Sequence, residues 1–175
     1  MESNTLSFDA SPWAGHEINC PYALLSELFN FAHLYEFKHY LTSAMSYNYK
    51  SKVYCKKDPG RILTIYVVLH SLLRVGYVLQ VQGETYRVEE TTPIPKDIGL
   101  GALTPKEFQN PFLVFQEAFA GNTLDEFDLA WYEIVLFSLS PSTETITWDL
   151  FNPYSHLIKM LDASWLIHVR GIQPV

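Results

Sequence analysis

The sequence predicts an α+β fold that is mainly helical, with about five helices and a small antiparallel sheet. Long apolar segments without a helix breaker, repeated helix-start signals, and one alternating stretch around a short turn lead to this expectation. A chain of 175 residues with 48% apolar residues is long enough to bury its own core. We expect a loose N-terminal segment over residues 1–18 and one compact domain over residues 19–175. That domain divides most naturally into parts 19–90 and 103–171, the second of them acidic and helical.

The first predicted helix covers residues 22–45. Pro21 suits the first turn of a helix, and no glycine or proline follows it before residue 45. Apolar residues dominate the segment. The next stretch, residues 46–57, is rich in Tyr and Lys and reads as a strand or an ordered basic loop.

A second helix is predicted over residues 58–75, followed by a hairpin. Asp58-Pro59 combines a capping residue with a proline at the first helical position, and Gly76 suits the residue after a helix end. Apolar and polar residues then alternate on both sides of Gln82-Gly83. Because such a two-residue turn joins antiparallel strands, the pattern predicts a hairpin over residues 77–88.

The C-terminal half reads as helices separated by loops and turns. Two Thr-x-x-Glu sequences have the spacing of a capping box, in which the Thr and Glu side chains bond to the first backbone N–H groups of a helix. The expected elements are a loop over residues 90–101, a helix from Thr104 that Pro111 interrupts or divides, a helix from Thr123 to about Ser138, a short strand over residues 144–148, and a last helix from Asn152-Pro153 to about Gly171.

One segment resembles part of a known DNA-binding family. The run DPGRILTIYVVLHSLLRVGYVLQVQGETYRV, residues 58–88, is similar in pattern to the recognition helix and wing of winged-helix domains. Such elements occur in DNA-binding regulators and in the dimerisation domains of O-methyltransferases, so the resemblance implies nucleic-acid binding or dimerisation. It covers about a fifth of the chain. Residues 46–57 depart from the family, because they read poorly as the helix that should precede a recognition helix.

Charge is unevenly distributed along the chain. Residues 38–87 contain eight of the twelve Lys and Arg residues but two of the nineteen Asp and Glu residues, although the net charge is −7. This basic middle third could attract an anionic partner or face the acidic remainder of the chain. Tyrosines interleave with its densest cluster, as in many phosphate-contacting surfaces. The candidate nucleic-acid or anion patch is Lys50, Lys52, Lys56, Lys57 and Arg61.

The first predicted helix also contains a possible metal site. His33, Glu36 and His39 are three residues apart and would share one helical face. Glu-x-x-His is half of the motif found in di-iron helix bundles, but the chain has no second copy of it. Other histidines could complete a mononuclear site. Histidines packed in the core with backbone partners are the alternative.

Several function classes lack their sequence signals. There is no GxSxG nucleophile elbow and no GxxxxGK[ST] phosphate loop, so the sequence favours a non-enzymatic protein without a cofactor. Cys20 and Cys55 read as free thiols of a reducing compartment. The N-terminus lacks a secretory signal, and the most apolar window, residues 62–73, is too short to span a membrane. We expect a cytoplasmic protein that does not associate with membranes.

Taken together, these features predict an interaction or oligomerisation protein, either a homo-oligomer or a subunit bound to another protein. Two helices apolar on most sides must be surrounded, and a chain of this size surrounds only one or two such helices. Aromatic residues, at 15% of the chain, also suit interfaces. The alternatives are a winged-helix-like nucleic-acid-binding regulator and a small metal-dependent helical enzyme around Glu36. Candidate interface residues are Phe29, Tyr40, Tyr66, Leu69 and Leu73.

Overall fold

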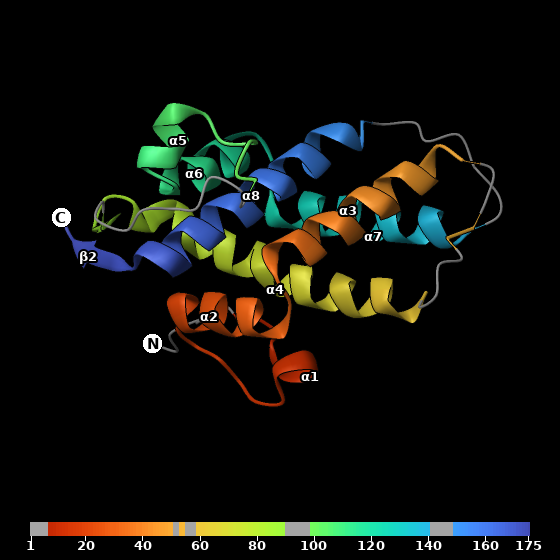
Figure 1. Cartoon of the computed structure of the whole chain (residues 1–175), viewed down its shortest axis with the longest axis horizontal. Helices are drawn as coiled ribbons and strands as arrows, with labels where there is room; N and C mark the ends of the chain where they lie inside the picture. The colour runs from red at the N-terminus through yellow and green to blue at the C-terminus, as the bar shows by residue number, and fades with distance from the viewer. Residues whose placement is uncertain (1–6, 51–52, 55–58, 90–98, 141–148) are drawn as a thin grey trace.

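A computed structural model of the chain describes residues 7–50, 53–54, 59–89, 99–140 and 149–175. The molecule is mainly helical with one two-stranded antiparallel sheet (Figure 1), which confirms the predicted class. The described residues form eight helices, however, so the expected number of about five is wrong. The elements are α1 (Ser11–Ala14), α2 (Pro21–Phe31), α3 (Leu34–Asn48), α4 (Gly60–Gln82), β1 (Tyr86–Val88), α5 (Pro105–Gln109), α6 (Phe112–Gly121), α7 (Leu124–Leu139), α8 (Phe151–Arg170) and β2 (Ile172–Pro174).

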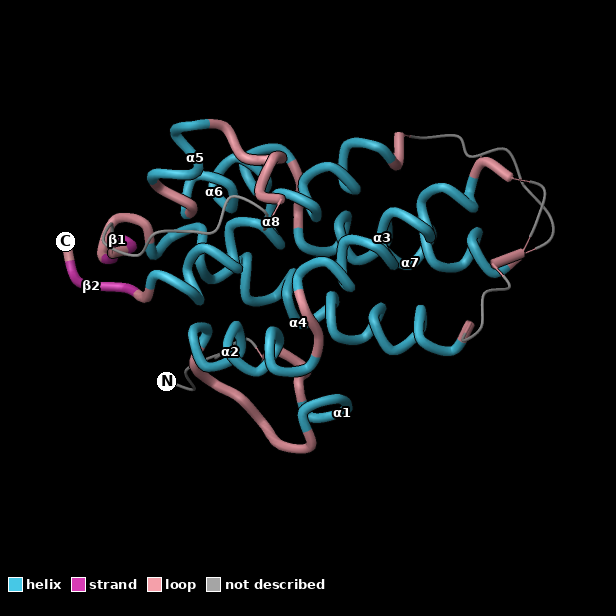
Figure 2. The backbone as a smooth tube through the Cα atoms, viewed as in Figure 1, coloured by secondary structure: helices cyan, strands magenta, loops and turns pink. Residues whose placement is uncertain are grey.

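Two long helices, α4 and α8, organise the packing of the others. Helix α4 contacts α1, α2, α3, α6 and α7, and α8 contacts α2, α3, α5, α6 and α7 (Figures 1 and 2). The buried apolar residues form one cluster that draws on both halves of the chain. Burial of that cluster is the main favourable contribution to folding.

The first predicted helix is interrupted, so a single helix over residues 22–45 is wrong. Helix α2 ends at Phe31, and Ala32 is extended with φ −155° and ψ 152°. His33 is also extended, and its ring Nδ1 accepts a hydrogen bond from Tyr35 N at 3.3 Å at the start of α3. The side chain therefore acts as a helix cap. No glycine or proline marks this break, which is why the sequence pattern missed it.

The predicted hairpin over residues 77–88 is wrong, because α4 continues through Gly76 to Gln82. A Cβ at Gly76 would lie 3.0 Å from Phe115 Cδ1, and one at Gly83 would lie 2.8 Å from Phe112 Cβ. Both glycines allow the chain to approach α6 closely, but Gly76 lies inside α4, whereas Gly83 lies in the turn that ends it.

The sheet pairs distant parts of the chain instead of neighbouring ones. Strand β1 lies antiparallel to β2 at the C-terminus (Figure 2). The predicted recognition helix with a wing is therefore not formed over residues 59–88, since the strand that follows the helix pairs with β2 at the C-terminus. The paired residues are Tyr86 with Pro174, Arg87 with Gln173, and Val88 with Ile172.

The longer α4 also changes one expectation about membranes. It is long and apolar enough, by length and composition alone, to cross a membrane, so the statement that no window suffices is wrong. The reason is that the helix extends seven residues beyond the predicted end at Val75. Most of its apolar residues are buried against other helices of the chain, as in the core helix of a folded domain.

The N-terminal residues that the structure describes are packed onto the core. Phe8, Ala10 and Ile18 are buried, and the short helix α1 lies against α4. This differs from the expected loose segment. The sequence missed the attachment because the apolar residues here are too scattered to show a helical or strand period.

The capping signals in the C-terminal half are confirmed. Thr104 and Thr123 both form complete capping boxes, and Pro111 separates α5 from α6. Helix α8 ends at Arg170, before Gly171 with φ 75°. The strand predicted over residues 144–148 lies outside the described residues.

Candidate interaction surface

The predicted metal ligands do not converge on a common point. Glu36 instead pairs with Arg61, whose guanidinium reaches its Oε1 at 2.7 and 3.1 Å. The His33 ring lies 5.4 Å from the Trp165 ring, and the His39 ring stacks on Tyr35. In the part of the chain that the structure describes, no group of three or more His, Cys, Asp or Glu residues is placed to hold a metal ion.

The predicted basic patch is described only at its two ends. Lys50 is exposed and lies over the Tyr47 ring at 4.7 Å. Arg61 is engaged with Glu36 and lies over the Phe31 ring at 5.1 Å, so the protein itself compensates much of its charge. Lys52, Lys56 and Lys57 lie outside the described residues, as does Cys55, while Cys20 is an exposed free thiol.

The predicted interface residues belong largely to the chain's own core. Leu69 and Leu73 have no exposed surface. Tyr66, Phe29 and Tyr40 are half-buried and pack against the core, and the Tyr66 carbonyl accepts a hydrogen bond from the Trp131 indole at 3.1 Å. These five residues alone therefore do not form an exposed apolar surface.

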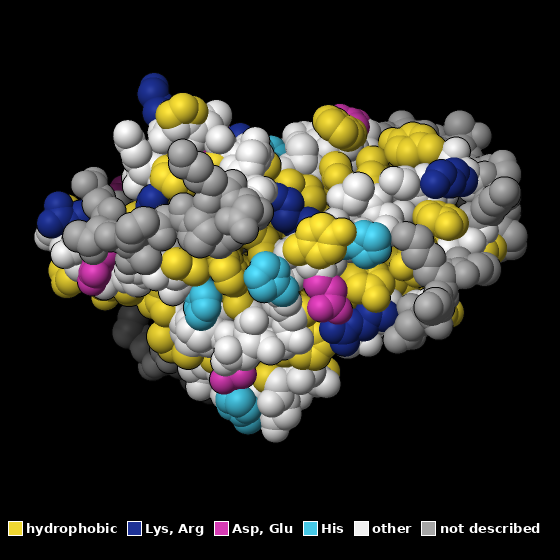
Figure 3. All heavy atoms as spheres, viewed as in Figure 1, with side chains coloured by type: hydrophobic (Ala, Val, Ile, Leu, Met, Phe, Trp, Pro, Cys, Tyr) yellow, Lys and Arg dark blue, Asp and Glu magenta, His cyan; other side chains and the backbone are white. Residues whose placement is uncertain are grey.

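Histidine and aromatic rings gather where α2, α3 and α8 meet. Figure 3 shows histidine side chains beside hydrophobic ones on this face. The centre of the Phe29 ring lies 4.9 Å from that of Trp165 and 5.4 Å from that of His168. Burial lowers the pKa of His168, and its Nδ1 lies 3.4 Å from Ser26 Oγ beside a cavity of 130 Å³. Because that hydroxyl donates to the Tyr22 carbonyl at 3.2 Å, the pair is not arranged for nucleophilic catalysis.

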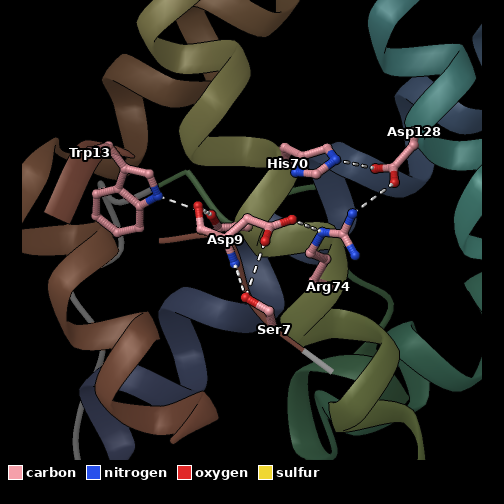
Figure 4. Close-up of polar contacts among 7 residues, drawn as sticks. Ser7, Asp9, Trp13, His70, Arg74 and Asp128 are labelled. Carbon is pink, nitrogen blue, oxygen red and sulfur yellow. Dashed lines mark hydrogen bonds and ion pairs between the residues drawn. The ribbon is translucent and has the colours of Figure 1, made fainter. Parts of the chain in front are cut away.

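A polar cluster attaches the N-terminal segment and α7 to the middle of α4 (Figure 4). Arg74 Nε lies 2.8 Å from Asp9 Oδ2, and His70 Nε2 lies 3.3 Å from Asp128 Oδ1. The Ser71 hydroxyl accepts from the Trp13 indole at 2.9 Å and donates to the Asp9 carbonyl at 3.2 Å. Although Ser, His and Asp occur together, the hydroxyl is fully used by these structural bonds and does not face the imidazole.

The outer face of α7 carries an apolar stripe that the sequence analysis missed. Leu129, Tyr132 and Leu136 are 52%, 49% and 43% exposed. Their spacing of three and four residues places them on one side of the helix. The opposite side contributes the fully buried Phe127 and Trp131. The signal was present in the sequence, but α7 is apolar on both sides and the spacing alone does not say which side is covered.

A groove opens beside this stripe, between the N-terminal parts of α7 and α8. Its volume is about 460 Å³. Leu129 belongs to both the stripe and the groove, so the two form a continuous surface, which we call the α7 face. The described residues that line the groove are Asn122, Glu126, Leu129, Asp149, Asn152 and Pro153.

The α7 face is bordered by acidic side chains. Helix α7 contains four Asp and Glu residues and no Lys or Arg. Glu126 and Asp149 line the groove and hold backbone N–H groups: the carboxylate of Glu126 accepts from Thr123 N at 2.7 Å, and that of Asp149 from Phe151 N at 2.8 Å. Hydrogen bonds from Thr123 lower the pKa of Glu126 below the usual value for Glu. Its carboxylate is therefore charged at neutral pH.

Comparisons with protein-family models, with curated proteins and with solved structures found no match to this chain.

Proposed function

We propose that this protein is a non-enzymatic interaction protein that binds another protein chain through the α7 face. The observation that carries the proposal is the row of Leu129, Tyr132 and Leu136, each about half exposed on one side of a helix. Neighbouring large apolar side chains that remain exposed are typical of surfaces that a partner covers. The adjoining groove adds a concave region into which an anchoring side chain can fit.

Packing inside the chain supports the same conclusion. Helix α4, which is apolar on most sides, is already surrounded by five other helices. Its exposed apolar side chains, Leu63, Tyr77 and Val81, are spread along the helix. Helix α7 covers α4 and α3 with one side and keeps Leu129, Tyr132 and Leu136 exposed on the other, at a spacing of three and four residues.

Site-specific photocrosslinking in the source cells tests this proposal. A benzophenone amino acid at position Leu136 should give a discrete covalent adduct, and one at Tyr35, which is 73% exposed on α3, should not give the same adduct. Leu129→Lys should remove the adduct while leaving the circular dichroism spectrum unchanged. An adduct of twice the 20.1 kDa chain mass would identify a second copy, and any other mass another protein. Identical adducts from both positions, or none from Leu136, would overturn the proposal.

A further inference from the structure

Resting on that proposed function, we infer that the occupant of the α7 face is a basic amphipathic helix of another protein, and that it is not the α7 helix of a second copy of this chain.

The apolar stripe has a spacing that suits packing against a second helix. Leu129 and Leu136 are seven residues apart, which is about 10 Å along a helix axis. A partner helix with apolar residues at intervals of three, four and seven residues would present anchors at the same spacing. The groove beside Leu129, about 460 Å³ in volume, has room for one further side chain of such a helix.

The charge around the stripe selects a basic partner. Asp125 and Glu126 are exposed on α7 close to the stripe, Glu133 is half-buried on the same helix, and Asp149 lines the groove just before α8. The fourth acidic residue of α7, Asp128, turns toward α4, where it meets His70 and Arg74. The partner would therefore meet carboxylates and no cation on α7. Lys or Arg side chains flanking the apolar anchors would complement them.

The same charges argue against a second copy docking through its own α7. A symmetric contact would place the carboxylates of one copy against those of the other, with no Lys or Arg on either helix. Like charges brought together across an interface oppose association. A chain that carries its basic groups beside its apolar residues avoids this repulsion.

Synthetic helices of defined composition provide the test. The purified full-length protein is titrated with three fluorescently labelled 18-residue peptides, and binding is followed by fluorescence anisotropy at physiological salt. The first has leucines at positions i, i+3, i+4 and i+7 and lysines elsewhere. The second replaces lysine by glutamate. The third is a scramble of the first that has no apolar face. We expect the first to bind at least tenfold more tightly than either of the others.

Variants of the α7 face then locate the binding site. Leu129→Lys should weaken binding of the leucine–lysine peptide at least tenfold. The pair Glu126→Gln and Asp149→Asn keeps the hydrogen-bond acceptors of both helix caps but removes two charges. Because exposed ion pairs contribute little each, we expect about a two- to fivefold loss per charge and a weaker salt dependence. Glu117→Gln, an exposed change on α6, is the matched control and should have no effect.

The outcomes separate this inference from the function on which it rests. Equal binding of the scrambled peptide, or equal effects of the paired variant and of Glu117→Gln, would overturn the inference. So would a crosslinked adduct of two copies through Leu136. In each case a position-specific adduct from Leu136 would still support the proposed function, whereas absence of any adduct there would remove both.

Discussion

Replacing Gly76 by alanine tests how closely α4 packs against α6. The glycine is buried in the middle of α4, and an added Cβ would meet Phe115 Cδ1 at 3.0 Å and Cε1 at 3.3 Å. In an unhindered helix, alanine is favoured over glycine by about 1 kcal/mol. Overpacking a buried site costs about 1–3 kcal/mol. We expect the overlap to outweigh the helix preference, so that Gly76→Ala lowers the free energy of unfolding by about 1 kcal/mol.

Urea unfolding, followed by tryptophan fluorescence, measures this change. Gly121→Ala is the matched control, because nothing lies within 4 Å of its Cβ position, and it should stabilise the protein by about 0.4–1 kcal/mol. Phe115→Leu should make Gly76→Ala less harmful, because the smaller side chain gives the methyl group room. The reasoning fails if Gly76→Ala stabilises the protein as much as Gly121→Ala does, or if its effect is the same beside Leu as beside Phe.

Three further changes test polar contacts of the fold. Lys38→Met removes the ammonium that lies 2.8 Å from the fully buried carboxylate of Asp162. We expect the free energy of unfolding, measured in urea at neutral pH, to fall by about 3–5 kcal/mol. The loss should be smaller in acid, because burial raises the pKa of Asp162 and the carboxyl group is then neutral more readily. Thr123→Ala removes the α7 cap and should lower stability by about 1 kcal/mol, measured the same way; an unchanged value would contradict the cap. Burial raises the pKa of Glu107, but hydrogen bonds from Lys159 and from the α5 cap outweigh it, so the pKa is lowered overall. The charged carboxylate therefore stabilises the fold above the usual pKa of Glu, and this stabilisation is lost as the pH falls through the lowered pKa. Glu107→Gln should therefore flatten the acid side of a plot of Tm against pH, and an equally steep plot would contradict this assignment.

Capping-box signals predicted the starts of α5 and α7, whereas the start of α3 at Leu34 was missed. The capping boxes at Thr104 and Thr123 each use a side chain and a backbone group within four residues, so the sequence contains the whole interaction. The same holds for Pro21 at the start of α2. Such contacts do not depend on how distant parts of the chain pack.

Signals whose meaning depends on distant residues were misread. Glycine after an apolar helix is typical of a helix end, but at Gly76 it makes room for Phe115, which lies 39 positions later in the sequence. The alternation around Gln82-Gly83 matches a hairpin, yet the partner of β1 is the C-terminal β2. Tertiary contacts outweighed the local preference in both cases.

The sequence did not show which helix keeps a row of apolar side chains exposed, for a similar reason. A helix that is apolar on most sides must be surrounded, and α4 was therefore expected to reach a partner. The chain surrounds α4 itself by adding the N-terminal α1 and by dividing the first predicted helix into α2 and α3, so that both can pack on it. Leu63, Tyr77 and Val81 of α4 remain exposed, but the closely spaced row of exposed apolar residues lies on the outer side of α7. In the function that we propose, the acidic residues of α7, which favour the start of an isolated helix, are also charges that the partner would complement.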